Sequence, residues 1–248
     1  MFFQPHFVRM NTKVKMLRKD KKKAAFLLNC LIWTQLAFTS DILQADQVIR
    51  YVALGDSYTI GTGVALEEAW PSLLVRHLQT QGVEIELVAN LAKAGWTSQN
   101  VIEYQLPVFK QLNPTFTTLL IGANDVVRGV SPEQFSQNLK HLLDRIAEIL
   151  PQKNQVVLIT IPDFSVTPQG KNFGAGSRER IQEFNTMIKK EAQQRQWPWV
   201  DLFVLSQEMG QDTALIAADG LHPSVQSHQL WEKEIYRAVS TCLLTTDH

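Results

Sequence analysis

The sequence is poor in cysteine and lacks the spacings that bind the common protein metals. Only two of its 248 residues are cysteine, Cys30 and Cys242. If the N-terminal segment that contains Cys30 is removed, a single thiol remains and no disulfide can form within the chain. Neither a CxxC nor an HExxH spacing occurs. The sequence therefore indicates no metal site, and we expect no cofactor.

Two other motifs are missing. The glycines closest to a phosphate-binding loop, Gly55, Gly61 and Gly63, follow neither GxGxxG nor GxxxxGK(S/T), which disfavours a nucleotide-binding protein. The chain also contains no GxSxG elbow, and this argues against the α/β-hydrolase fold.

An excess of basic charge is missing from most of the chain. Of 24 basic and 24 acidic residues, residues 1–23 hold eight Lys or Arg and one Asp, so the remainder carries 16 basic and 23 acidic side chains, a net charge of −7. Phosphate binding depends on clustered Lys and Arg. We therefore expect no nucleic acid partner.

The N-terminal segment has the pattern of a secretory signal peptide. The basic stretch precedes residues 24–38, about fifteen mostly apolar residues, whereas a membrane-spanning helix needs about 20. We expect residues 1–46 to form a leader and short linker, and residues 47–248 to form one folded domain. The protein would then be secreted or periplasmic, with membrane contact only through an uncleaved leader. A membrane-anchored protein is the alternative.

Short apolar runs alternate with amphipathic segments along the rest of the chain. The predicted strands cover residues 48–54, 84–91, 116–121, 155–161 and 199–204. The predicted helices cover residues 67–81, 97–112, 131–149, 177–196 and 224–243. This alternation predicts an α/β fold with a parallel five-stranded sheet covered by helices on both faces. Ligands of such sheets gather beyond the carboxyl ends of the strands.

A serine stands at the end of the first predicted strand. Gly55 allows a sharp turn there, and Asp56 and Ser57 follow it where a helix begins. Ser57 is a candidate nucleophile, although Asp56 and Ser57 would also suit a helix cap. Gly95 and Asn124 each follow a later strand, so a parallel sheet would bring them to the same edge as Ser57.

A base for this serine is available in a loop near the C-terminus. Histidine is the side chain whose ordinary pKa lies nearest neutrality. Of the six histidines, His222 stands in a predicted loop with Asp219 three residues earlier. Asp219 could accept a hydrogen bond from one ring nitrogen and leave the other to face Ser57. The alternatives are an exposed loop histidine and a helix-capping aspartate.

Acyl transfer also needs hydrogen-bond donors for the developing oxyanion. The backbone N–H groups of Ser57 and Gly95 and the side-chain amide of Asn124 are the candidates. Gly95 could instead be a turn glycine, and Asn124 a residue that tolerates an unusual backbone angle.

Together these segments resemble the SGNH, or GDSL-type, hydrolases. The four blocks are Gly55-Asp56-Ser57, Gly95, Gly122-Ala123-Asn124-Asp125 and Asp219-Gly220-Leu221-His222. Each block alone is weak evidence for the family, but all four occur in the order that the family has. The resemblance covers residues from about 48 to 243. Tyr58 stands where the family commonly has leucine, and Trp96 follows the second-block glycine. Both departures could reshape the acyl pocket.

The resemblance implies a flavodoxin-like three-layer α/β/α sandwich without a metal. Ser57 would be the nucleophile, His222 the general base and then acid, and Asp219 the residue that orients His222. The backbone of Ser57 and Gly95 and the side chain of Asn124 would form the oxyanion hole.

The expected activity is hydrolysis of a carboxylic ester or thioester through an acyl-enzyme. The resemblance implies a small-molecule acyl ester as substrate, lipid-like or small, as for a lysophospholipase, a thioesterase or an arylesterase. One alternative on the same fold is a carbohydrate O-deacetylase. An alternative of another class is a non-catalytic binding module.

Overall fold

The computed structural model describes residues 48–244, and the predicted leader over residues 1–46 lies outside this range. Within the described range one sheet contains the strands β1 (Ile49–Gly55), β2 (Ile85–Asn90), β3 (Phe116–Leu120), β4 (Val156–Ile159) and β5 (Trp199–Val200). Their order is β2-β1-β3-β4-β5, and every neighbouring pair is parallel. This 2-1-3-4-5 order is that of a flavodoxin-like sheet, as predicted.

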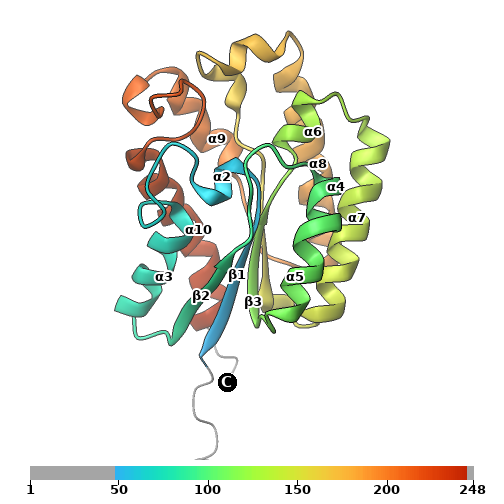
Figure 1. The fold of residues 1–248 in the computed structure, drawn as a ribbon, viewed down its shortest axis with the longest axis vertical. Coiled ribbons are helices and arrows are strands. Elements are labelled where there is room, and N and C mark those ends of the chain that lie inside the picture. The colour runs from blue at the N-terminus through green and yellow to red at the C-terminus, as the bar shows by residue number, and fades with distance from the viewer. Residues whose placement is uncertain (1–47, 245–248) are drawn as a thin grey trace, which may run out of the picture. The chain divides into compact units, whose positions relative to one another are not determined.

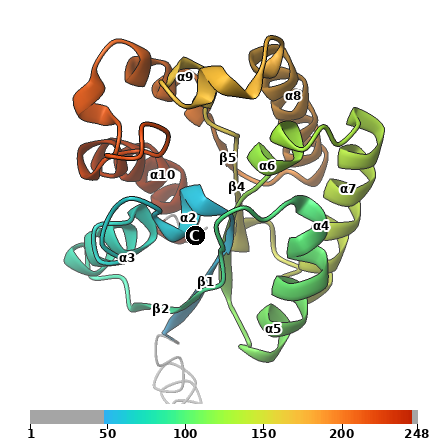
Figure 2. The same ribbon diagram turned by 45° about the horizontal axis from the view of Figure 1, so that its top comes forward.

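Helices cover both faces of the sheet (Figures 1 and 2). On one face lie α3 (Trp70–Thr80) and α10 (Val225–Leu244), and on the other lie α4 (Ser98–Asn100), α5 (Leu106–Gln111), α7 (Pro132–Ile149) and α8 (Ser177–Arg195). Three short helices follow the carboxyl ends of strands: α2 (Ser57–Ile60) after β1, α6 (Ala123–Val127) after β3 and α9 (Leu202–Ser206) after β5. The predicted three-layer α/β/α fold is confirmed.

The centre of the sheet is buried on both faces, so its polar side chains need partners inside the protein. All five residues of β3 are buried. The Thr117 hydroxyl donates to the Val52 carbonyl at 2.7 Å, and the hydroxyls of Tyr51 and Thr118 lie 2.7 Å apart. Because these buried hydroxyls are paired, they carry little desolvation cost.

The long helix α7 begins as the sequence predicts. Ser131 is its N-cap and accepts a hydrogen bond from the Gln134 N–H at 3.2 Å, and Pro132 occupies the first helical position. The apolar face of the helix, which includes Phe135 and Leu139, is fully buried. Capping, proline placement and periodicity therefore agree on one helix.

The prediction for β5 is wrong in length. The apolar run 199–204 predicts a single strand, but β5 ends at Val200 and α9 begins at Leu202. Asp201 caps this helix, because its carboxylate accepts the Phe203 N–H at 3.1 Å. A short apolar run does not distinguish a strand from a buried helical turn.

The helix that follows β2 is not regular. Between α4 and α5 the chain forms a π-helix, η1 (Val101–Gln105), in which the Leu106 N–H bonds to the carbonyl of Val101. A π turn holds one residue more than an α turn. Pro107 comes directly after Leu106 and has no N–H to donate. The π turn therefore lies beside a position at which a regular α-helix would also lack one backbone hydrogen bond.

Short 3₁₀ helices occupy several of the connections between these strands and helices. They are η2 (Lys153–Gln155), η3 (Phe164–Val166), η4 (Gly170–Phe173), η5 (Gln207–Gly210) and η6 (Thr213–Leu215). Among residues 48–244 no helix has the length and apolar character that crossing a bilayer requires.

Candidate active site

The turn after β1 presents Ser57 at the carboxyl edge of the sheet. β1 ends at Gly55, and Ser57 is the first residue of α2. Asp56 caps α2 through its Oδ1, which accepts the Tyr58 N–H at 3.1 Å. Gly55 has a φ of +154°, and a Cβ added there would lie 2.4 Å from the Leu120 carbonyl oxygen. The turn therefore requires glycine at this position.

A pocket of about 280 Å³ opens beside Ser57. Ser57, Gly95, Asn124 and His222 all line it, although they come from four separate parts of the chain. The rest of the lining is apolar and consists of Tyr58, Ala94, Ala123, Val127, Phe164, Phe173 and Leu221. The structure thus brings the four predicted residues together. The fifth, Asp219, does not line the pocket but is hydrogen-bonded to the ring of His222.

The loop after η6 holds His222 by its backbone and by its ring. The His222 Nδ1 lies 2.6 Å from Asp219 Oδ2, while Asp219 Oδ1 accepts the N–H groups of Leu221 and His222 at 2.9 and 3.0 Å. Partial burial by itself would raise the pKa of Asp219, but these hydrogen bonds outweigh it and lower the pKa below its usual value. An ionised Asp219 fixes the proton on Nδ1, so Nε2 is left as the acceptor.

The neighbouring histidine is not a competing base. His228 is fully buried, and its Nδ1 accepts the Trp70 N–H at 3.2 Å. Burial and, to a smaller extent, the charge of His222 together lower the pKa of His228 to about 4. His228 therefore stays neutral near pH 7.

Three candidate hydrogen-bond donors belong to residues that line the pocket. Within residues 48–244, the N–H groups of Ser57 and Gly95 have no acceptor in the protein. Asn124 donates one amide hydrogen to the Trp96 carbonyl at 3.0 Å, which orients the amide and leaves its second hydrogen for another acceptor. Unpaired donors at a pocket wall suit an anionic oxygen.

A buried carboxylate joins the second and third blocks. Asp125 accepts the Ser98 N–H at 2.8 Å and the Ser98 hydroxyl at 2.5 Å, and Asn138 donates to the same hydroxyl at 3.1 Å. Burial raises the pKa of Asp125, although the Ser98 hydrogen bonds act against it. Arg128 adds a third link by donating to the Gly95 carbonyl at 2.6 Å. No local motif in the sequence predicts these links, because the partners are distant in the chain.

The loop between β4 and α8 forms the apolar wall of the pocket. Phe164 and Phe173 meet edge to face, with ring centroids 5.7 Å apart. The same loop is attached to the histidine loop, because the Gln169 N–H donates to the Gly220 carbonyl at 3.0 Å.

Tyr58 and Trp96, the two residues that depart from the family pattern, differ in whether they line the pocket. Tyr58 lines the pocket, and its ring centroid lies 5.4 Å from that of His222. Trp96 is not part of the lining. Its ring instead faces Tyr104 at 5.4 Å and the ammonium of Lys93 at 5.3 Å.

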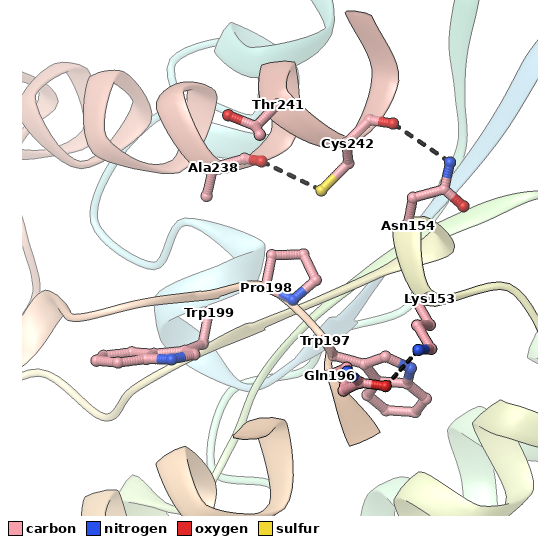
Figure 3. A pocket seen from close by; sticks show the side chains of 9 residues that line it. All are labelled: Lys153, Asn154, Gln196, Trp197, Pro198, Trp199, Ala238, Thr241 and Cys242. Carbon is pink, nitrogen blue, oxygen red and sulfur yellow. Dashed lines mark hydrogen bonds between the residues drawn. The ribbon is translucent and has the colours of Figure 1, made fainter. Parts of the chain in front are cut away.

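A second hollow, of about 580 Å³, lies near the amino ends of β4 and β5, and Figure 3 shows the side chains that line it. Its wall is made by segments just before β4 and at β5 and by the end of α10, and it includes Trp197, Trp199 and Cys242. The Cys242 thiol donates to the Ala238 carbonyl, and burial raises its pKa to about 11, so it stays protonated near pH 7. In the part of the chain that the structure describes, no group of three or more His, Cys, Asp or Glu could hold a metal ion.

Comparison with known proteins agrees with this geometry. A model of the GDSL-like lipase/acylhydrolase family matches residues 53–230. An arylesterase from Vibrio mimicus is 25% identical over 186 residues, 75% of this chain and 84% of that protein. Esterase TesA from Pseudomonas aeruginosa is 25% identical over 206 residues, 82% of this chain and 90% of that protein.

Among solved structures, the crystal structure of TesA matches with a TM-score of 0.64 at 24% sequence identity, covering 78% of this chain and 99% of that chain. The family match spans most of the described residues and confirms the resemblance noted from the four blocks. The chain therefore belongs to the GDSL-like lipase/acylhydrolase family and is an ester hydrolase.

Proposed function

We propose that the protein is a serine esterase that hydrolyses carboxylic esters through an acyl-enzyme on Ser57. One observation carries the proposal: Ser57, Gly95, Asn124 and His222 line a single pocket. Within the described residues, His222 Nε2 and the N–H groups of Ser57 and Gly95 have no partner in the protein. A nucleophile, a base and donors are thus all available to one carbonyl group.

The proposed reaction has two halves. Ser57 Oγ attacks the ester carbonyl carbon while His222 Nε2 takes the hydroxyl proton, and the resulting oxyanion accepts from Ser57, Gly95 and Asn124. The intermediate collapses when the C–O bond to the leaving group breaks and His222 returns the proton to the departing alcohol. Water then attacks the acyl-enzyme with His222 again as base, which releases the acid and restores Ser57.

We infer that the acyl or aryl group of the substrate is small. The pocket volume of about 280 Å³ lies at the lower limit of typical ligand pockets, which span roughly 300–1,000 Å³. Its lining is apolar apart from the reacting groups. A longer, lipid-like chain would have to extend past Val127 and Phe173, whose side chains are partly exposed.

The test uses Ser57→Ala beside the wild-type protein. A series of p-nitrophenyl esters of increasing chain length, with acyl-CoA, lysophospholipid and acetylated sugars in parallel, identifies the substrate class. We expect wild-type turnover on short p-nitrophenyl esters and none by a folded Ser57→Ala variant. Preference for acetylated sugars would instead favour a carbohydrate O-deacetylase.

A fluorophosphonate probe separates the catalytic proposal from a binding module. The wild-type protein should form an adduct at Ser57, located by mass spectrometry of its peptides. An active Ser57→Ala protein, or a folded wild-type protein that gives neither adduct nor turnover, would rule out the proposed mechanism.

A further inference from the structure

The side chain of Gln105 is bonded to the backbone just before the proposed nucleophile. Its Oε1 accepts the Gly55 N–H at 3.0 Å, and its Nε2 donates to the Gly55 carbonyl at 2.7 Å. Only 1% of Gln105 is exposed. Both polar groups of its amide are therefore used on a single residue, 50 positions earlier in the chain.

This amide takes the place of a missing strand neighbour. β1 pairs with β2 as far as Ala53, which is opposite Asn90, whereas its pairing with β3 continues to Gly55. On the β2 side, Gly55 has only a long backbone bond of 3.4 Å from the Lys93 N–H to its carbonyl. Gln105 thus supplies the pair of bonds that a neighbouring strand normally supplies.

The location of Gln105 depends on an irregular helix. Gln105 is the last residue of the π-helix η1, whose extra residue changes which side chain faces the sheet. The irregular turn places the side-chain amide of Gln105 beside Gly55, at the end of β1. Such π turns occur frequently at functional sites.

We propose that Gln105 is a positioning residue for Ser57: its amide holds the Gly55 peptide in the orientation from which the turn presents the serine hydroxyl and N–H to the pocket. The inference rests on the proposed function of Ser57. Gln105 does not line the pocket, so it acts through the backbone and not on the substrate.

The protein contains a second side-chain clamp of the same chemistry, which provides a control. Asn185 accepts the Ile161 N–H at 2.8 Å and donates to the Ile161 carbonyl at 2.9 Å. Asn185 is also buried, and Ile161 follows β4 as Gly55 ends β1. Loss of either clamp removes two side-chain hydrogen bonds from the backbone of one residue, but only the Gln105 clamp adjoins Ser57.

The experiment compares Gln105→Met and Asn185→Leu for stability, kcat, KM and the rate of fluorophosphonate labelling. We expect similar losses of thermal stability. For Gln105→Met we expect kcat and the labelling rate to fall roughly 10- to 100-fold, because small displacements of a reacting group cost this much. KM should stay within about twofold, as expected when ground-state binding is unchanged. Asn185→Leu should keep its kcat within about twofold of the wild type.

A third variant, Gln105→Glu, adds a readout that a purely structural role would not change. A protonated glutamic acid has one donor and one acceptor, as the amide has, whereas an ionised carboxylate only accepts. The ratio of its kcat to that of the wild type at the same pH should therefore rise as pH falls. Asp56 and Asp125 are present in both proteins, so the ratio divides out their own contribution to the pH profile.

The outcomes distinguish the two proposals. Wild-type activity with unchanged kcat in Gln105→Met, or equal losses of kcat in Gln105→Met and Asn185→Leu, would overturn the positioning role alone. If Gln105→Met does not fold, Gln105→Glu decides, and a pH-independent ratio overturns the role. If the wild-type protein shows neither turnover nor a Ser57 adduct, both proposals fail.

Discussion

Asp56 and Asp219 are both within three residues of a proposed catalytic group, yet their surroundings drive their pKa values apart. Asp219 is partly exposed and accepts hydrogen bonds from His222 and Leu221, which lower its pKa. Asp56 is fully buried, and this burial raises its pKa to about 8, aided by the charge of Asp125 and opposed by the Tyr58 N–H. Its Oδ2 has no hydrogen-bond partner among the described residues. At neutral pH the two groups therefore carry different charges.

The state of Asp56 makes folding stability depend on pH. Between its usual pKa of 3.8 and about 8, Asp56 is ionised in the unfolded chain and protonated in the folded protein. The folded state then binds more protons, so the free energy of unfolding decreases as pH rises through this window. Asp56→Asn removes the effect. We expect the variant to gain stability relative to the wild type between pH 5 and pH 8, by on the order of a few kcal/mol, as measured by urea unfolding.

Asp212→Asn is the control for this prediction. Asp212 also caps a short helix, since its Oδ1 accepts the Ala214 N–H at 2.9 Å, but it is exposed. Because its carboxylate is exposed, its replacement should not reproduce the gain in stability expected for Asp56→Asn. Parallel stability curves for wild type and Asp56→Asn would show that Asp56 is already ionised in the folded protein.

At the residue scale the sequence predicts the candidate catalytic residues better than the residues that hold them in place. Ser57, Gly95, Asn124 and His222 were identified because each follows a strand or stands in a loop within a short motif. Gln105 has no such local signal. Its partner is 50 residues away, and in the sequence it is one polar residue in a helix.

At the scale of single elements, helices with several agreeing signals were predicted well, and short elements were not. α7 has a cap, a first-position proline and a clear apolar face. β5 has two residues, and the adjoining apolar residues belong to α9 because Asp201 caps that helix. The apolar periodicity of residues 97–112 predicts a regular helix and carries no signal for the π turn of η1.

The strand β1 and the helix α2 meet at a turn where space, and not only backbone angle, requires glycine. Gly82 also has a positive φ, of +83°, but no atom lies within 4 Å of an added Cβ there. We expect Gly82→Ala to cost about 1–2 kcal/mol of folding stability, from the backbone angle alone. Gly55→Ala should cost at least about 2 kcal/mol more, because its Cβ would overlap the Leu120 carbonyl and Thr59.

Urea unfolding of both variants measures this difference, and loss of soluble folded Gly55→Ala protein would be its extreme form. Equal losses in Gly55→Ala and Gly82→Ala would show that the turn relaxes to accept a side chain.

At the scale of the whole molecule, the pocket is formed by several segments that are distant in the sequence. Its lining comes from the helices α2 and α6, which follow β1 and β3, from the turn after β2, from the loop after β4 and from the loop that precedes α10. No one segment therefore sets the substrate range. The alternation of strands and helices predicted this shared edge, whereas the pocket's volume depends on side-chain packing that the sequence does not reveal.

Phe173 is the lining residue whose removal should extend the pocket with least damage. Its side chain is 41% exposed, so truncation leaves no sealed cavity. We expect Phe173→Ala to raise kcat/KM for longer p-nitrophenyl esters relative to the acetate by several-fold to about 10-fold, the scale of one or two methylene contacts. Val204→Ala removes an exposed apolar side chain that does not line the pocket, and it should leave the chain-length profile unchanged. An unaltered profile in Phe173→Ala would place the acyl group elsewhere.

The bond from the Gln169 N–H to the Gly220 carbonyl restricts how this enzyme can be redesigned. A loop grafted from a relative to alter selectivity would disturb the histidine if it replaced that contact. Gly170 must also be kept, because a Cβ added there would lie only 1.7 Å from the Phe164 carbonyl oxygen. Residues 171–176 are thus the part that an engineer can exchange, while the stretch from Phe164 to Gly170 should be kept as the anchor.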